Sequence, residues 1–171
     1  LFERESVKPG RRTELCLMAQ VLVTGAPLDM QRPRLSVCFV LDASGSMAAE
    51  DFKPKNRFFV AKAATRTFVE GRPQDRLGLI AFAGRSYILT PLTVDGGAVS
   101  LYLDGLDPDL ASEGGTDLAA ALNQGLELLE ATSEISDRVL VVFTDGETHD
   151  SLSAVEDAAA AIKKAGIRLI L

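Results

Sequence analysis

Short apolar runs, each bounded by polar or turn-forming residues, predict the strands of one sheet. Four of them cover 35–41 (LSVCFVL), 77–82 (LGLIAF), 139–143 (VLVVF) and 167–171 (IRLIL). Nearly unbroken apolar runs of this length are typical of parallel strands that helices cover on both faces. Residues 87–89 predict one more short strand, and its connection through Gly84 is too brief for a parallel crossover. We therefore expect that strand to be antiparallel and to lie at an edge.

Apolar residues with a period near 3.6 predict the helices between these strands. The helices cover 57–70, 116–130 and 153–165, with a further short helix at 99–103. In the helix 153–165, Ser153 and Glu156 have the spacing of a capping box, and Gly166 is placed to end the helix. Strands and helices therefore alternate along most of the chain.

This alternation predicts an α/β fold with a doubly wound, mainly parallel, Rossmann-like sheet flanked by helices. We expect the strand order 3-2-1-4-5-6, with strand 3 antiparallel at the edge. The domain covers 35–171, and we expect it to be truncated at its C-terminal end because the chain stops inside an apolar run. Residues 1–34 form an N-terminal extension, in which 13–24 alternates with a period of two and predicts a strand followed by a connector.

The composition narrows the possible classes of function. The 171 residues suit one domain, and 47% hydrophobic and 25% charged residues are typical of an ordinary globular protein. A formal net charge of -6 argues against a nucleic-acid partner, which needs clustered Lys and Arg. The longest apolar stretch, 15–28, is shorter than the roughly 20 residues that span a bilayer. Because the first residue is Leu rather than Met, we expect the chain to be a fragment of a longer protein.

The cysteine and histidine content limits the metal chemistry that is available. Cys16 and Cys38 lie in apolar runs, so we expect both to be buried and reduced. His149 is the single histidine, and a zinc site needs a cluster of His or Cys ligands. Any metal in this protein is therefore expected to bind oxygen atoms.

Three segments rich in oxygen-bearing side chains lie at predicted strand ends or helix starts. They are Asp42-Ala43-Ser44-Gly45-Ser46, Gly114-Gly115-Thr116-Asp117 and Thr144-Asp145-Gly146. With the expected strand order, strands one and four are neighbours at the point where ligands bind in open α/β sheets. We therefore expect Asp42 and Asp145 to face each other across one crevice, and Gly45 to give its loop a tight turn.

Together these segments predict one site for a divalent metal. Its candidate ligands are Asp42, Ser44, Ser46, Thr116 and Asp145. Carboxylate and hydroxyl oxygens suit Mg²⁺, with Mn²⁺ or Ca²⁺ as substitutes. The two aspartates neutralise a dication, while the hydroxyl ligands leave it electron-poor, so an incoming carboxylate would complete its coordination. We leave out Asp117, which favours a helix N-terminus, and Glu147 and His149, which we assign to a solvated loop.

The order of these segments resembles the metal-ion-dependent adhesion site of von Willebrand factor type A (VWA) domains, over roughly 35–171. The resemblance implies that Ser44, Ser46 and Thr116 contact the metal directly, while the two aspartates commonly act through water. The segments at 49–54, 75–84, 91–93 and 144–149 are similar to the bacterial aerotolerance-type (BatA/BatB-like) VWA proteins. That similarity implies a bacterial, membrane-anchored protein associated with a MoxR-type AAA+ ATPase.

Three functions are compatible with such a site. The first is a binding module that captures an Asp or Glu of a protein partner through the metal. The alternative is an assembly subunit in which the site docks a MoxR-type AAA+ ATPase or its client. A more remote alternative is a metal-dependent phosphohydrolase. We do not expect an enzyme, because the chain has neither a GxSxG elbow nor an obvious histidine base beside Ser44 or Ser46.

Overall fold

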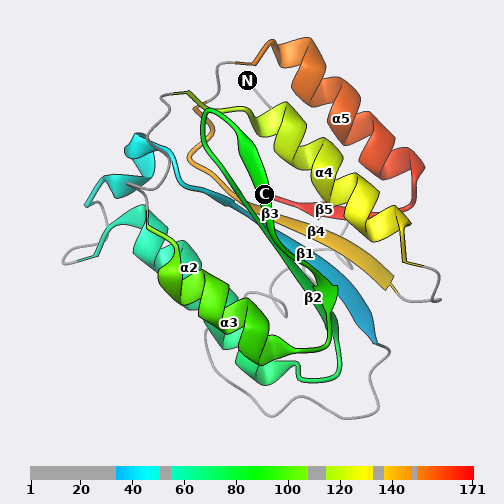
Figure 1. Ribbon diagram of the computed structural model, residues 1–171. Helices are drawn as coiled ribbons and strands as arrows, with labels where there is room; N and C mark the ends of the chain where they lie inside the picture. Colours follow the sequence, from blue (N-terminus) through cyan, green and yellow to red (C-terminus); the bar gives the residue numbers. More distant parts are fainter. Residues whose placement is uncertain (1–33, 51–54, 108–114, 133–136, 148–149) are drawn as a thin grey trace, which may run out of the picture.

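Over the residues that the computed structural model describes, a five-stranded sheet lies between two pairs of helices (Figure 1). The structure describes residues 34–50, 55–107, 115–132, 137–147 and 150–171. The expected strand at 13–24, Cys16, Gly114 and His149 lie outside the described residues. The elements are β1 (Leu35–Asp42), the 3-10 helix η1 (Gly45–Ala48), α2 (Arg57–Gly71), β2 (Arg76–Phe82), β3 (Ser86–Thr93), α3 (Gly96–Gly105), α4 (Leu118–Glu130), β4 (Asp137–Phe143), α5 (Leu152–Lys164) and β5 (Arg168–Ile170).

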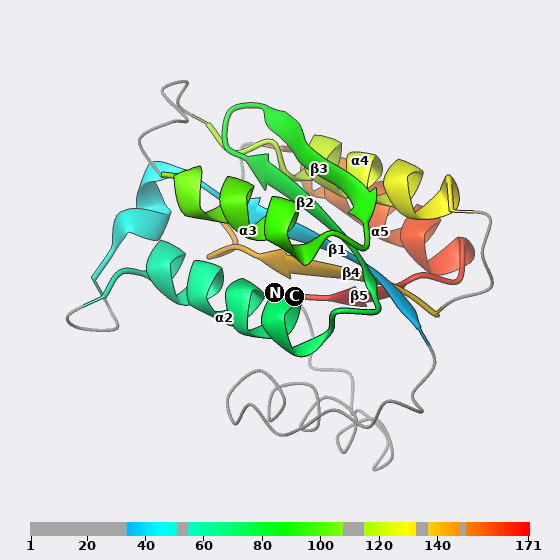
Figure 2. The same cartoon turned by 60° about the horizontal axis from the view of Figure 1, so that its bottom comes forward.

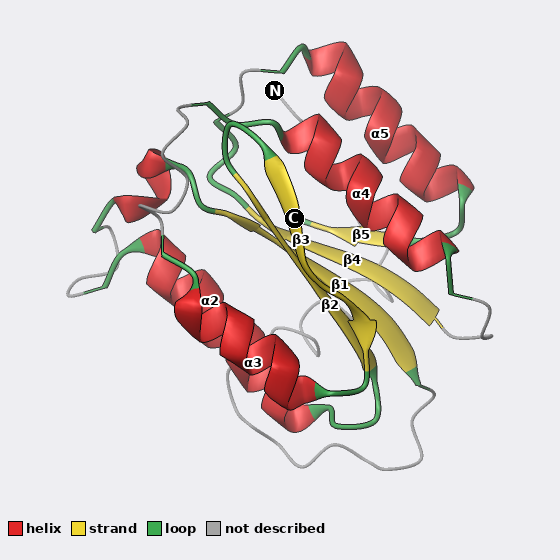
Figure 3. Cartoon of the chain, in the orientation of Figure 1, coloured by secondary structure: helices red, strands yellow, loops and turns green. Residues whose placement is uncertain are grey.

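The sheet has the strand order β3-β2-β1-β4-β5 (Figure 3). β1 pairs in parallel with both β2 and β4, and β5 pairs in parallel with β4. β3 is antiparallel to β2 and lies at the edge. The predicted fold class is therefore confirmed, and the described strands take the first five places of the predicted order.

The central strand β1 divides its side chains between two apolar cores. Val37, Phe39 and Leu41 belong to the core that also contains residues of α2 and α3. Cys38 and Val40 face the opposite core, which contains residues of α4 and α5. Figure 2 shows these two helix pairs on opposite faces of the sheet. Successive side chains of a strand point to opposite faces, so an unbroken apolar run is what a strand covered on both sides requires.

Two elements, β3 and α3, are much longer than their predicted extents. β3 spans eight residues instead of 87–89, and α3 spans ten instead of 99–103. β3 contains Pro91, which lacks a backbone N–H and is tolerated because the strand lies at the sheet edge. Asp95 caps α3 by accepting a hydrogen bond from the Ala98 N–H at 3.0 Å. Both differences arise because edge strands and half-exposed helices carry weaker apolar periodicity than central elements.

The start of α5 differs from its prediction. Ser151, not Ser153, is the N-cap, and its Oγ accepts a hydrogen bond from the Ala154 N–H at 3.3 Å. The predicted capping box of Ser153 and Glu156 is therefore wrong, because Ser153 already lies inside the helix. Gly166 follows the helix with a φ of 71°, a left-handed conformation that glycine adopts without steric cost, so the predicted end of the helix is correct.

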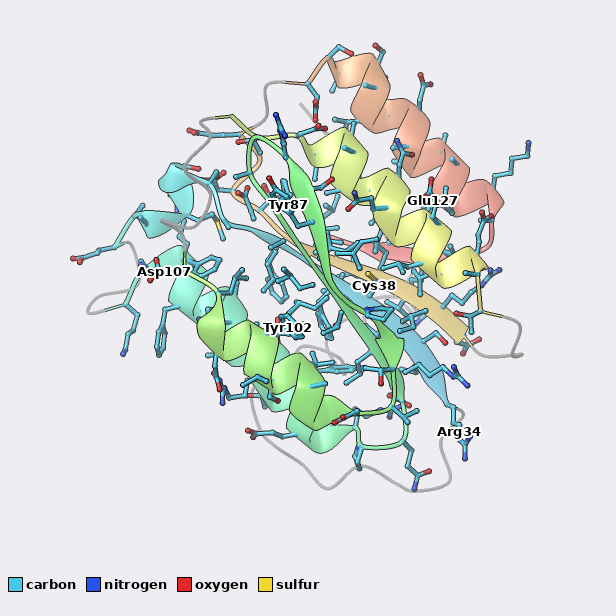
Figure 4. All side chains as sticks on the ribbon, in the orientation of Figure 1. Arg34, Cys38, Tyr87, Tyr102, Asp107 and Glu127 are labelled. Carbon is cyan, nitrogen blue, oxygen red and sulfur yellow. The ribbon has the colours of Figure 1, made fainter. Side chains whose placement is uncertain are left out.

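The thiol of Cys38 lies in the middle of the sheet (Figure 4), with no exposed surface. It is free, as predicted, and burial raises its pKa to about 12. The reactive form of cysteine is the thiolate, so burial and the raised pKa both protect this residue. In a Cys16→Ser variant we expect Ellman's reagent to leave the native protein unmodified at about pH 8.5, the ordinary thiol pKa. One thiol should react after unfolding in urea, and rapid reaction of the native protein would contradict this burial.

In the part of the chain that the structure describes, no helix has the length and apolar character needed to cross a membrane.

Candidate metal centre

The three predicted segments lie together at the carboxyl ends of the parallel strands, at the upper left of Figure 1. The Ala43 N–H donates to the Phe82 carbonyl at 2.7 Å, which ties the segment after β1 to the end of β2. The Asp117 N–H donates to the Ala83 carbonyl at 2.7 Å, which ties the start of α4 to the same end. The third segment directly follows β4, which pairs with β1. Parallel pairing therefore collects loops that are far apart in the sequence.

Asp42 is fully buried and both of its carboxylate oxygens accept hydrogen bonds. Oδ1 accepts from the Ser44 N–H at 2.9 Å, and Oδ2 accepts from the Thr144 hydroxyl at 2.8 Å. A buried carboxylate is tolerated when hydrogen bonds or a cation compensate for lost hydration. Thr144 was not among the predicted site residues, although it precedes Asp145, and it connects the first predicted segment to the third.

The two serines connect Asp42 to Asp145. The Ser44 N–H contacts Asp42, and the Ser44 and Ser46 hydroxyl oxygens lie 3.0 Å apart. Burial raises the pKa of Asp145, but hydrogen bonds from the Ser46 hydroxyl and the Glu147 N–H, together with the Arg57 guanidinium, outweigh it and lower the pKa below its ordinary value. Asp145 is therefore stabilised as a carboxylate, the form that a metal requires.

Arg57, the first residue of α2, also belongs to this centre, although it was not among the predicted site residues. Its Nη1 donates to Asp145 Oδ2 at 2.9 Å, and the Asp145 side chain is 5% exposed. The contact joins residues 88 positions apart. One signal in the sequence pointed to Arg57: a cation at the first position of a helix opposes the helix dipole.

Thr116 is buried immediately before α4, with 5% of its surface exposed. The preceding Gly115 has a φ of 127°, which favours glycine, and the following Asp117 caps the helix by accepting from the Ala120 N–H at 3.0 Å. The predicted capping role of Asp117 is therefore confirmed. Asp150, before α5, accepts from the Ala119 N–H at 2.8 Å and so holds the first turn of α4 in place.

Two further predictions concern residues beside the predicted ligands. Glu147 is exposed, in agreement with its assignment to a solvated loop. Gly45 lies in η1 without a left-handed φ, and a Cβ added there would meet no atom within 4 Å. The expectation that Gly45 is needed for a tight turn is therefore wrong. A short 3-10 helix redirects the loop with ordinary dihedral angles.

The donor set at this edge fits a hard divalent cation. The predicted ligands carry oxygen donors only, two carboxylates and three hydroxyls. Among the described residues, no group of three or more His, Cys, Asp or Glu side chains is arranged to hold a metal. A metal bound here would therefore depend on the hydroxyls as well as on Asp42 and Asp145, a combination that suits Mg²⁺ or Mn²⁺ better than a soft metal.

Comparisons with known proteins agree with this architecture. The family profile of the von Willebrand factor type A domain matches residues 37–147. An uncharacterised protein of Borreliella burgdorferi is 37% identical over 111 residues, which cover 64% of this chain and 32% of that protein. The crystal structure of the hypothetical protein BatB from Bacteroides thetaiotaomicron superposes with a TM-score of 0.70 and 33% identity, covering 80% of this chain and 64% of that one.

A second crystal structure has a similar relation to this chain. It is an aerotolerance-related membrane protein of Bacteroides fragilis, with a TM-score of 0.67 and 31% identity, covering 80% of this chain and 65% of that one. The chain spans about a third of the length of the first curated relatives it matches. On the matched profile, the identity to these relatives and the structural similarity to two of them, the chain belongs to the von Willebrand factor type A domain family and resembles its bacterial aerotolerance-type members.

Proposed function

We propose that this VWA domain captures an acidic residue of a partner protein through a divalent metal, most naturally Mg²⁺, held by Asp42, Ser44, Ser46, Thr116 and Asp145. VWA domains are generally interaction modules without enzymatic activity, and they commonly bind a divalent metal. The finer assignment rests on one observation. Hydrogen bonds link the Ser44 backbone N–H to Asp42, the Ser44 hydroxyl to the Ser46 hydroxyl, and the Ser46 hydroxyl to Asp145.

The spacing of the serine oxygens supports this proposal. Mg²⁺ prefers octahedral coordination at about 2.1 Å, so two neighbouring ligand oxygens lie about 3 Å apart. Ser44 Oγ and Ser46 Oγ are 3.0 Å apart and need little rearrangement to bind one ion. Ser44 and Thr116 are both buried, which reduces the competition between bulk water and a metal for their two hydroxyls.

The charge of the ligand set explains why a carboxylate is the preferred partner group. Asp42 and Asp145 balance the charge of a dication, and the three hydroxyls contribute none. When bound, the metal supplies a Lewis-acidic position at the carboxyl ends of the parallel strands. A carboxylate oxygen is the ligand that suits this position best. Neither an activated nucleophile nor a second acid–base group is needed for such binding, so we propose a non-enzymatic role.

Column capture tests this function. The domain and its Asp42→Ala variant are immobilised, and a lysate of a bacterium that encodes a close relative is passed over both in Mg²⁺. We expect at least one protein to bind the unaltered domain, to elute with EDTA and to be missing from the variant column. Replacing a surface Asp or Glu of that protein should abolish its capture. Binding that survives EDTA or the Asp42→Ala change would contradict the proposal.

The immobilised domain and its Asp42→Ala variant also test the two alternative functions, the assembly subunit and the phosphohydrolase. Elution of a MoxR-type AAA+ ATPase would favour the assembly subunit, whereas Mg²⁺-dependent turnover of p-nitrophenyl phosphate that is lost in Asp42→Ala would favour a phosphohydrolase.

We further propose that residues 1–34 are an extension to the VWA unit at 35–171. We also propose that the whole protein is bacterial and membrane-anchored, since the similar Bacteroides fragilis protein is described as a membrane protein.

A further inference from the structure

Arg57 occupies the end of α2 that is least favourable for its charge. It is the first residue of the helix, and the first turn of α2 contains no acidic residue. A helix N-terminus carries partial positive charge, so a cation there destabilises the helix. Local rules of helix stability are most often broken where function requires it. The reason for Arg57 should therefore lie outside its own helix.

Arg57 is held at the candidate metal centre by its side chain and by its backbone. Its guanidinium Nη1 donates to Asp145 Oδ2 at 2.9 Å, while its backbone N–H donates to the Ala49 carbonyl at 3.1 Å, just after η1. The Arg57 side chain is 34% exposed, compared with 5% for Asp145. One end of the cation therefore touches a predicted metal ligand, and part of its side chain is open to solvent.

The charges of these groups have opposite consequences for metal and ligand. Ionised Asp42 and Asp145 contribute two negative charges, and Arg57 adds one positive charge beside Asp145. The guanidinium therefore repels a dication that arrives alone. Once the dication is bound, the centre has three positive and two negative charges, and one carboxylate from a partner would neutralise the excess.

We propose that Arg57 couples metal binding to ligand binding: it weakens the binding of Mg²⁺ alone and strengthens the capture of a carboxylate by the Mg²⁺-loaded centre. Arg57 is then a specificity-determining residue that favours simultaneous binding of both. This inference rests on the proposed metal site. It adds Arg57, which is not a metal ligand, to the residues that control binding. It also predicts opposite effects of the Arg57 charge on the affinity for Mg²⁺ alone and on the affinity of the loaded centre for a carboxylate.

Calorimetric titration with Mg²⁺ alone tests the first effect. Arg57→Gln keeps a hydrogen-bond donor beside Asp145 and removes the charge, and we expect it to bind Mg²⁺ about tenfold more tightly than the unaltered domain. Arg57→Lys should stay close to the unaltered domain. The matched control is Arg66→Gln, which removes an arginine paired with Asp104 from the same helix and should leave the affinity unchanged. Unchanged or weaker Mg²⁺ binding by Arg57→Gln would overturn the inference.

Acetate serves as the carboxylate probe for the second effect. In the unaltered domain we expect sodium acetate to raise the Mg²⁺ affinity above that in sodium chloride of equal ionic strength, and Arg57→Gln should lose most of this gain. If Arg57 only stabilised the structure of the site, Arg57→Gln would bind Mg²⁺ more weakly, which is the opposite of the tighter binding that we expect. If Arg57→Gln is unstable, Arg57→Met removes the charge and keeps an aliphatic side chain.

The two proposals fail in different ways. Absence of Mg²⁺ binding by the unaltered domain and by every variant would overturn the metal site, and this inference with it. Mg²⁺ binding by the unaltered domain, lost in Asp145→Ala but not tightened in Arg57→Gln, would retain the metal site and overturn only the role of Arg57.

Discussion

Replacing Asp145 by Ala is expected to weaken Mg²⁺ binding by about 100-fold or more, equivalent to about 2.7 kcal/mol. The change removes one of the two negative charges among the proposed ligands and the acceptor of the hydrogen bond from Ser46. The fold should remain intact because Asp145 follows β4 in a loop, outside both apolar cores. Isothermal titration calorimetry measures the affinity, and circular dichroism checks the fold.

Glu147→Ala is the matched control for Asp145→Ala. It removes the same charge two residues further along the same loop, from an exposed side chain. Exposed charges are screened by solvent and salt, so the Mg²⁺ affinity should change by about twofold at most. An equal loss of Mg²⁺ binding in both variants would indicate a general effect of surface charge and would reject Asp145 as a ligand.

Replacing Phe39 by Ala is expected to lower the free energy of unfolding by about 3–5 kcal/mol. Phe39 lies in the central strand with 1% of its surface exposed. Its ring packs edge-on against Phe68 of α2, with 5.3 Å between the ring centroids. The variant loses this contact and leaves a cavity that the surrounding β1 and α2 backbones cannot fill. Urea unfolding followed by circular dichroism measures the change.

Tyr102→Ala provides the comparison for Phe39→Ala. Tyr102 lies on α3 (Figure 4), which packs on the same face of the sheet. In contrast to Phe39, 51% of its surface is exposed. Truncating an exposed aromatic residue should change the free energy of unfolding by about 0.5 kcal/mol or less. A loss for Phe39→Ala no larger than that for Tyr102→Ala would contradict the position of Phe39 in the core.

The predicted site residues differ in how far the sequence alone could place them. Asp42, Ser44 and Ser46 lie within five positions, so their proximity was a local property of one loop. The approach of Asp145 followed from two predicted strands and a general rule of strand order. The contact of Arg57 with Asp145 could not be predicted from a general rule of this kind. It depends on how α2 crosses the sheet and on which atoms the long arginine side chain can reach.

The order of strands and helices, the antiparallel edge strand and the segments that carry the proposed ligands could all be predicted from the sequence. These features are encoded locally, because burial on one or two faces imposes a period on the apolar residues. Other features became visible in the folded chain alone: the full lengths of β3 and α3, the cap of α5, and the contacts of Thr144 with Asp42 and of Arg57 with Asp145. Those contacts join residues 102 and 88 positions apart, and no local pattern specifies which distant side chain will meet a buried carboxylate.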